Sequence, residues 1–182
     1  MHRQALIVGG GIGGLCAAIC LRLTGWDVQV FEQAPEITEI GAGLQISPNG
    51  VKILEHIGVM QRLESAVFEP EAIEIRMGVS GRPILYLPMK GVAAQRWGAR
   101  YLQVHRADLI TALSARLDAL QPGAMQTGCP VRGYAPCKDG AEVILANGRR
   151  IQADLVIGAD GIHSRIRHQM LGPDAPRFTG NY

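Results

Sequence analysis

Three glycines near the amino terminus have the spacing that a dinucleotide site requires. Gly9, Gly11 and Gly14 follow the apolar run of residues 5–8 directly and open a segment rich in alanine and leucine. In this pattern the first glycine allows a tight turn and the second lets the backbone approach a diphosphate. The third glycine lets a helix pack closely on a strand. The start of that helix would present N–H groups and a partial positive charge to the phosphate oxygens.

An acidic residue stands at the position where a dinucleotide site binds the adenosine ribose. Glu32 closes a second apolar run, residues 28–31, and lies 18 residues after Gly14. A carboxylate there accepts hydrogen bonds from the ribose hydroxyls of an adenosine moiety, and it would repel a 2′-phosphate. The site is therefore expected to prefer FAD or NAD over NADP. The alternative is a structural glycine turn beside a surface glutamate.

Two further groups of residues stand where an apolar run meets an expected helix. Asp160 follows the run 155–157, and Ser164 and Arg167 come shortly after it. The amides of this turn are expected to form a second anion site, with Asp160 either orienting water or a ribityl hydroxyl or capping the helix. Arg106 follows the run 101–104, and its guanidinium could contact a phosphate or a flavin oxygen.

The sequence gives little support for metal binding or nucleophilic catalysis. The five histidines, His2, His56, His105, His163 and His168, lack metal-ligand spacing, so no metal site is expected. No nucleophile–base pair can be argued, and no catalytic residue is predicted. The four cysteines form no CxxC pair; Cys16 and Cys20 are expected to be buried, and reduced thiols fit a cytoplasmic location.

The composition is that of an ordinary globular chain. Of 182 residues, 47% are hydrophobic and 19% charged, and the formal net charge is +2. So small a charge does not indicate nucleic acid or an acidic membrane as a partner. Residues 5–21 are uncharged, but they contain five glycines and are too short for a membrane span.

Periodicity predicts the elements that position these residues. Strands buried on both faces are expected over 5–8, 28–31 and 155–157, with a helix over 12–24 that ends at Gly25. Residues 33–46 are expected to form a loop. The remaining predicted helices cover 48–58, 59–66, 106–120 and 163–171, and the remaining predicted strands cover 72–77, 84–87, 101–104, 131–134 and 142–145, followed by a turn at Asn147-Gly148.

Together these motifs resemble the class A FAD-dependent aromatic hydroxylases, a group of flavoprotein monooxygenases, and in particular their salicylate hydroxylase-like branch. The stretches that carry the resemblance are residues 8–15, 31–34, 41–49, 104–109 and 154–167. The last of them corresponds to the family's DG motif.

The resemblance implies FAD as cofactor, NAD(P)H as co-substrate, and O₂ and a small aromatic compound as the other reactants. It places Gly9, Gly11 and Gly14 on the pyrophosphate, Glu32 on the adenosine ribose, Arg106 and Asp160 at the phosphate and ribityl region, Gln45 near the flavin ring and Val131 near the adenine. It leaves the aromatic substrate, the choice between NADH and NADPH and the oligomeric state open.

The expected fold is α/β, Rossmann-like and FAD-binding, with a mostly parallel sheet and an antiparallel insertion. Residues 1–70 are expected to hold the FAD-binding βαβ unit, 71–100 the insertion that starts a substrate-domain sheet, and 101–182 the rest of the FAD-binding domain. Family members are considerably longer and carry a later G-D-A-x-H-P motif, so this chain is expected to be their N-terminal part. Two alternatives stay open: a non-catalytic FAD- or ADP-binding module, and another flavin enzyme such as an epoxidase, a halogenase or an isoprenoid reductase.

Overall fold

The structure is a computed structural model that describes residues 3–36, 42–172 and 178–180. His2 and residues 37–41 of the predicted loop over 33–46 lie outside this part of the chain. The chain divides into two units, one formed by Met1–Ile37 with Leu113–Tyr182 and the other by Thr38–Ala112. Each unit is described by itself.

A four-stranded parallel sheet forms the centre of the first unit. It consists of β1 (Gln4–Val8), β2 (Asp27–Phe31), β8 (Met125–Gln126) and β12 (Leu155–Gly158), in the order β12-β1-β2-β8. All three pairings are parallel. The strands predicted over 5–8, 28–31 and 155–157 are therefore confirmed, although β12 is only partly buried, and the two-residue strand β8 is an addition.

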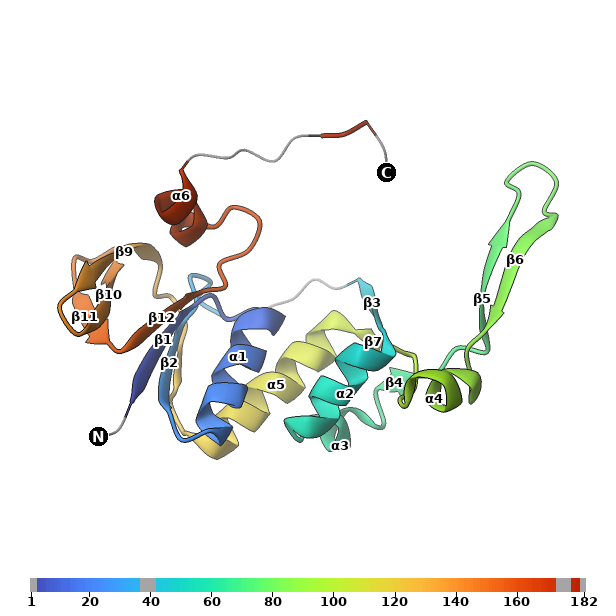
Figure 1. Ribbon diagram of the computed structural model, residues 1–182, viewed down its shortest axis with the longest axis horizontal. Coiled ribbons are helices and arrows are strands. Elements are labelled where there is room, and N and C mark those ends of the chain that lie inside the picture. The colour runs from blue at the N-terminus through green and yellow to red at the C-terminus, as the bar shows by residue number, and fades with distance from the viewer. Residues whose placement is uncertain (1–2, 37–41, 173–177, 181–182) are drawn as a thin grey trace. The chain divides into compact units, whose positions relative to one another are not determined.

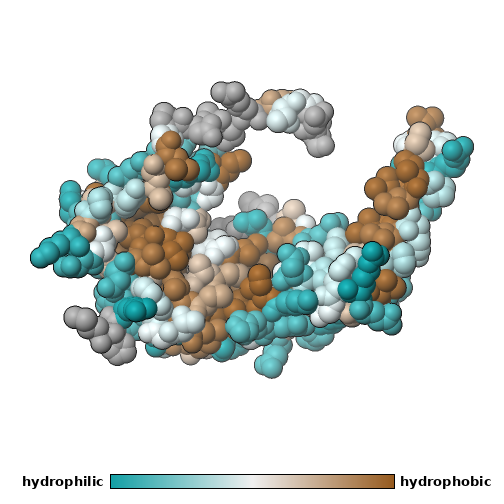
Figure 2. All heavy atoms as spheres, viewed as in Figure 1, coloured by the Kyte–Doolittle hydropathy of each residue, from teal (hydrophilic) through white to brown (hydrophobic). Residues whose placement is uncertain are grey.

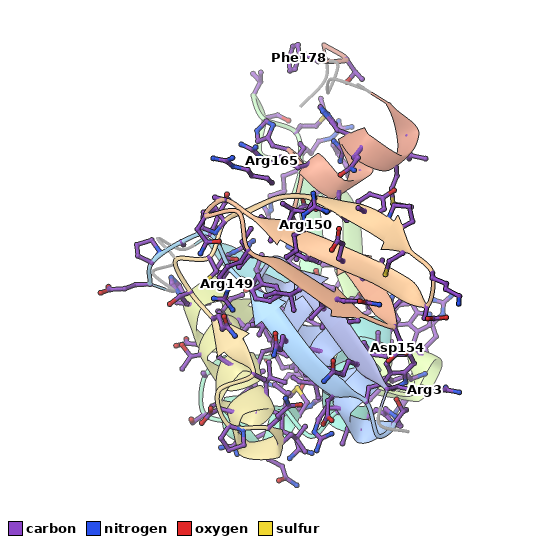
Figure 3. All side chains as sticks on the ribbon, turned by 90° about the vertical axis from the view of Figure 1, so that its left-hand side faces the viewer. Arg3, Arg149, Arg150, Asp154, Arg165 and Phe178 are labelled. Atoms are coloured by element: carbon purple, nitrogen blue, oxygen red, sulfur yellow. The ribbon has the colours of Figure 1, made fainter. Side chains whose placement is uncertain are left out.

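Both faces of this sheet are covered, which explains why its strands are mostly apolar. On one face lies α1 (Ile12–Leu23), where Gly14 approaches Ile7. On the other lies an antiparallel sheet of β9 (Val131–Cys137), β10 (Gly140–Leu145) and β11 (Arg150–Ala153). Figure 3 shows these strands in front of β1 and β2, and side chains of both sheets share one core of Leu6, Val8, Phe31, Val131, Val143, Leu145, Ala153 and Ile166.

Helix α5 (Arg106–Leu120) has the predicted bounds, and the boundary between the two units falls within it. Leu109, Leu113 and Leu117, spaced four residues apart, are all buried. Helix α6 (Arg165–Leu171) begins two residues later than predicted, because Ser164 is its N-cap residue.

The second unit contains a small antiparallel sheet of β3 (Gly43–Ile46), β7 (Leu102–His105) and β4 (Val67–Phe68), in the order β3-β7-β4. The predicted loop over 33–46 is wrong at β3, which pairs with β7 along its whole length. Helices α2 (Pro48–His56), α3 (Met60–Leu63) and α4 (Val92–Trp97) complete this part of the unit. Helix α4 was not predicted.

The strands β5 (Ala72–Arg76) and β6 (Pro83–Pro88) form a hairpin that extends beyond α4 (Figure 1). Apolar side chains along it, among them Ile75, Met77 and Leu85, are exposed, as the apolar surface in Figure 2 shows. None of the helices in residues 3–36, 42–172 and 178–180 is long and apolar enough to cross a membrane.

Candidate cofactor site

The glycine turn after β1 is held by close backbone contacts. Gly9 has a φ of +107°, a conformation that favours glycine, and its N–H donates to the Phe31 carbonyl oxygen at 2.8 Å. A Cβ at Gly9 would lie 2.3 Å from the Ala159 oxygen, so the turns after β1 and β12 touch. A Cβ at Gly14 would lie only 1.9 Å from the Gly9 oxygen. Helix α1 therefore packs on this turn at a distance that only glycine permits.

The opening of α1 is unobstructed. Gly11 is the N-cap residue, without a side-chain cap, and no acidic residue stands in the first turn. A Cβ at Gly11 or Gly13 would meet nothing within 4 Å. Since the first N–H groups of a helix have no partner within it, the turn offers donors and positive partial charge beside open space. These residues fit the diphosphate of a dinucleotide.

The Glu32 carboxylate lies at the mouth of this turn. Its Oε2 accepts a hydrogen bond from the Gly10 N–H at 2.7 Å, and its Oε1 accepts one from the Ala34 N–H at 2.9 Å. An ionised carboxylate has about four acceptor positions, so two remain for ribose hydroxyls. The acid is thus oriented by the backbone of the turn that it serves.

Gly10 is a site residue that the sequence reasoning missed. It is buried, and a Cβ there would lie 2.9 Å from the Met125 Cε and 3.0 Å from the Glu32 Cβ. It occupies an unconstrained position of the glycine pattern, so the pattern assigned it no role. The only sequence signal was that a third glycine stands between Gly9 and Gly11.

The turn after β12 is closed by its own side chains. The Asp160 Oδ1 accepts from the Ser164 hydroxyl at 2.5 Å, and its Oδ2 accepts from the N–H groups of Arg165 and Ile166 at 2.7 and 3.2 Å. The Ser164 Oγ in turn accepts from the Arg167 N–H at 2.9 Å. These three amides already have acceptors, so the expected second anion site is not formed by them. Asp160 caps α6, and its contact with a ribityl hydroxyl stays a prediction.

Val131 begins β9 near the same edge of the sheet. The Cys129 N–H donates to the Glu32 carbonyl oxygen at 2.8 Å, which ties the start of β9 to the end of β2. Val131 itself is buried in the core that also contains Val8 and Phe31. Its predicted backbone contact with adenine remains a prediction.

Gln45 lies within β3 of the second unit, and Arg106 follows β7, the strand that pairs with β3. Gln45 is exposed on β3, opposite Gln103 of β7. The Arg106 N–H donates to the Ala42 oxygen at 3.3 Å, just before β3 begins. The predicted cofactor contacts therefore fall into two groups. The first unit contains Gly9, Gly11, Gly14, Glu32, Val131 and Asp160, and the second unit contains Gln45 and Arg106.

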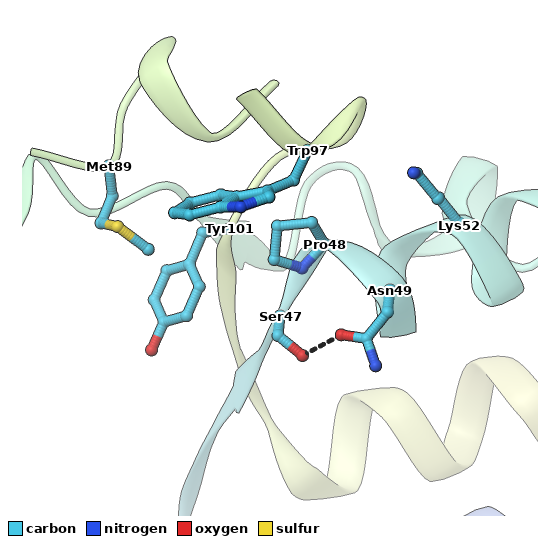
Figure 4. Close-up of a pocket in the computed structure, with 7 residues that line it drawn as sticks. All are labelled: Ser47, Pro48, Asn49, Lys52, Met89, Trp97 and Tyr101. Carbon is cyan, nitrogen blue, oxygen red and sulfur yellow. Dashed lines mark hydrogen bonds between the residues drawn. The ribbon is translucent and has the colours of Figure 1, made fainter. Parts of the chain in front are cut away.

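The second unit also has a hollow that was not predicted. Its volume is about 490 Å³, within the range of small-molecule pockets. Figure 4 shows its mainly apolar lining of Ser47, Pro48, Asn49, Lys52, Met89, Trp97 and Tyr101. Ser47 is the N-cap residue of α2, but its hydroxyl makes no capping bond to the helix and instead donates to the Asn49 Oδ1 at 2.5 Å.

The four cysteines are unpaired, and the described residues include no cluster of three or more His, Cys, Asp or Glu side chains able to hold a metal ion. Cys16 is half-buried, but Cys20 is exposed, so the prediction of a buried pair is wrong for Cys20. It lies on the solvent side of α1, one turn beyond Cys16. Burial and the neighbouring Cys20 thiol raise the pKa of Cys16 to about 11.

Comparison with known proteins identifies relatives of this arrangement. The chain is 38% identical over 174 residues to 3-amino-4-hydroxybenzoate 2-monooxygenase of Streptomyces cremeus, a match that covers 96% of the chain and 43% of the relative. It is 36% identical over 177 residues to 6-hydroxynicotinate 3-monooxygenase of Pseudomonas fluorescens, covering 96% of the chain and 44% of that protein. The chain thus spans less than half the length of these relatives.

The fold has close counterparts among solved structures. Klebsiella pneumoniae HpxO, solved with FAD and uric acid, superposes with a TM-score of 0.81 at 32% identity, over 94% of this chain and 42% of that one. The predicted α/β, Rossmann-like FAD-binding fold is therefore confirmed. The profile of the family described as "FAD binding domain" matches residues 2–179, and the chain belongs to this family.

Proposed function

We propose that this chain binds FAD and forms the cofactor-binding part of a monooxygenase that hydroxylates a small aromatic acid. The substrate would be salicylate- or hydroxybenzoate-like, with NAD(P)H and O₂ as the other reactants. One observation carries the cofactor assignment. The Glu32 carboxylate is bonded to the Gly10 N–H at the mouth of a helix start that has neither a side-chain cap nor an obstructing side chain.

Different residues of the first unit would bind different parts of the cofactor. The open first turn of α1 would bind the diphosphate through its N–H groups, and Gly9 and Gly14 keep that turn close to the sheet. Glu32 would accept hydrogen bonds from the adenosine ribose. When bound, FAD would supply the redox chemistry that links NAD(P)H to O₂. Gln45, Arg106, Val131 and Asp160 are proposed as further contacts on the strength of the family resemblance.

The substrate class is supported by the names of the relatives. 3-Amino-4-hydroxybenzoate and 6-hydroxynicotinate are both ring carboxylates with a ring hydroxyl group. Because the chain spans less than half of these proteins, the substrate and the hydroxylation are proposals about the whole enzyme. A cytoplasmic location, favoured by four unpaired thiols, belongs to the same proposal.

Titration of the protein with FAD, followed by flavin fluorescence, tests the cofactor assignment. Glu32→Gln is expected to weaken FAD binding by about 1–3 kcal/mol, because glutamine has one acceptor oxygen where two backbone N–H groups and the ribose need acceptors. Glu36→Gln is the matched control, since Glu36 is an exposed acid four residues away, and it should leave the affinity unchanged. No FAD uptake by the unmodified chain, or equal affinities for both variants, would overturn the assignment.

A second measurement separates an enzyme from a binding module. NAD(P)H oxidation is followed with FAD present, with and without hydroxybenzoates and hydroxynicotinates, and products are analysed by chromatography. Hydroxylated product supports the monooxygenase. FAD binding without oxidation or product favours a non-catalytic FAD-binding module.

A further inference from the structure

We propose that Gln169 is a positioning residue that ties the turn of residues 159–164 to strand β9 and thereby sets the geometry of the cofactor site. The inference rests on the proposed function, in which this turn lies beside FAD. Its physical basis is a pair of hydrogen bonds between one side chain and one backbone residue. The Gln169 Nε2 donates to the Tyr134 carbonyl oxygen at 2.5 Å, and its Oε1 accepts from the Tyr134 N–H at 2.9 Å.

These bonds complete an open sheet edge. β9 is the last strand of the order β11-β10-β9, so one side of its backbone has no strand partner. The Gln169 amide presents one donor and one acceptor to that side, as a neighbouring strand would. The approach is close, because a Cβ at Gly133 would lie 2.6 Å from the Gln169 Oε1. Helix α6 therefore acts, through one side chain, as a short extension of the antiparallel sheet.

Most side chains of helix α6 are exposed. Only Ser164 and Ile166, at and just after its start, are buried, and Ile166 fits against Gly158, where a Cβ would lie 2.7 Å from its Cγ2. Ile166 and Gln169 are three residues apart and so share one face of the helix. The Asp160 and Ser164 side chains hold the first turn of α6, and Gln169 holds its second half. Without Gln169, the second half of α6 would lose its two hydrogen bonds to β9, and the whole helix, with its first turn, could tilt about Ile166.

A tilt of α6 would change the cofactor site through two residues, Asp160 and Ala159. The Asp160 carboxylate is bonded to the Arg165 and Ile166 N–H groups, so it follows the start of the helix. The Ala159 oxygen, one residue earlier, contacts the position of Gly9 in the glycine turn. Gln169 touches none of the predicted cofactor contacts and acts only through these residues.

The chain contains a matched control. Gln121 makes the same pair of bonds with a backbone residue: its Oε1 accepts from the Val28 N–H at 3.1 Å, and its Nε2 donates to the Val28 oxygen at 2.9 Å. Val28 lies near the amino end of β2, whereas the glycine turn and Glu32 lie at the carboxyl ends of β1 and β2. Loss of these two bonds should cost stability at the opposite end of the sheet from the cofactor site.

The experiment compares Gln169→Met with Gln121→Met in the full chain. Methionine resembles glutamine in length and helix propensity but cannot form the paired hydrogen bonds. Urea unfolding of the FAD-free protein is expected to show a loss of stability in both variants, at least as large for Gln121→Met, whose bonds are part-buried, as for Gln169→Met, whose bonds are exposed. The Kd for FAD should rise about five- to tenfold in Gln169→Met and less than twofold in Gln121→Met, and the fluorescence quenching of bound flavin should change only in Gln169→Met. Equal effects of the two variants on FAD binding would overturn the positioning role.

A second variant opens the same contact without altering Gln169. Gly133 has no positive φ, so alanine is tolerated by its backbone, but the added Cβ would displace the end of the Gln169 side chain. Gly133→Ala should reproduce the loss of FAD affinity, and the Gly133→Ala, Gln169→Met double variant should lose little more than either single variant. Additive losses would contradict a shared contact.

Hydrogen exchange of the FAD-free protein separates failure of this inference from failure of the proposed function. Gln169→Met should increase the exchange rate of the Arg165, Ile166 and Arg167 amides, and Gln121→Met should not. If the unmodified chain takes up no FAD, the proposed function fails, and the exchange rates still decide whether Gln169 holds α6. Unchanged exchange of these amides in Gln169→Met would reject the inference whatever the chain binds.

Discussion

Two strand-to-helix turns meet at the same edge of the parallel sheet, and they treat the start of their helices in opposite ways. After β1, helix α1 begins at Gly11 with no side-chain cap and no acidic residue in its first turn. After β12, helix α6 begins with its first amides bonded to Asp160 and Ser164. One helix start is left open to a ligand, and the other is closed by the protein.

The difference shows that a strand followed by a helix is not in itself an anion site. Backbone geometry supplies unpaired N–H groups at every helix start, but side chains decide whether those groups remain available. Glycines at positions 9, 10, 11, 13 and 14 leave the first site open, and an aspartate with a serine four residues later closes the second. Anion affinity is therefore expected at α1, with the α6 turn serving as its rigid neighbour.

The largest expected effect on stability comes from Gly14→Ala, which disrupts the close packing of α1 on the glycine turn. The added Cβ would lie 1.9 Å from the backbone oxygen of Gly9, and neither backbone can yield easily. We expect a loss of about 3 kcal/mol or more in the free energy of unfolding, measured by urea denaturation. Gly13→Ala is the control, because a Cβ there meets nothing within 4 Å, and its stability should be unchanged or slightly higher. Similar denaturation midpoints for both variants would contradict the packing argument.

Gly11→Asp would convert the open helix start into a closed one. The backbone at Gly11 is extended, with φ −73° and ψ −178°, and a new side chain has room. An N-cap aspartate should raise the stability of the FAD-free protein by a few tenths of a kcal/mol. Its charge should at the same time lower FAD affinity about 100-fold, since like charges brought together cost several kcal/mol. Gly11→Asn, a cap without charge, should lose less affinity; equal losses would mean that electrostatic repulsion is not the cause.

The same contrast explains how much could be predicted from the sequence. The glycine turn and Glu32 depend on residues close together in the chain, and their geometry agrees with local patterns. The Asp160 carboxylate could bind a ligand or the first amides of its own helix, and the sequence pattern is compatible with either partner. Strand β3 was missed because it is stabilised by pairing with β7, about 60 residues later.

Distant backbone contacts were the least predictable features. β8 is only two residues long, Met125–Gln126, and exists because it pairs with the end of β2. The bonds from Gln121 and Gln169 to strand backbones follow no periodic pattern. Each depends on a tertiary contact that brings one amide to one strand edge, and such contacts override local propensity.

Asp160→Ala tests the closed turn directly and should have a smaller effect than Gly14→Ala. It removes the acceptor of the Ser164 hydroxyl and of two backbone N–H groups. We expect a loss of about 2 kcal/mol in the free energy of unfolding, the upper range for an N-terminal cap. Asp154→Ala is the comparison, because the exposed Asp154 carboxylate, labelled in Figure 3, accepts from the Gln4 N–H. Its loss should be about half as large, and a larger loss than for Asp160→Ala would contradict the capping role.

The smallest effect concerns Cys16 on α1 and depends on pH. Burial, with the Cys20 thiol as a second cause, raises the pKa of Cys16 from 9.0 to about 11, so the folded protein holds this proton more tightly than the unfolded chain does. The resulting stability is present below about pH 9 and is lost as the pH rises toward 11. For a half-exposed thiol partly screened by solvent, we expect a contribution of about 1 kcal/mol. Urea denaturation at pH 8 and pH 10.5 should show a steeper loss of stability in the unmodified chain than in Cys16→Ala, with Cys20→Ala close to the unmodified chain. Parallel losses of stability in all three proteins would show that α1 gains no stability from the protonated Cys16 thiol.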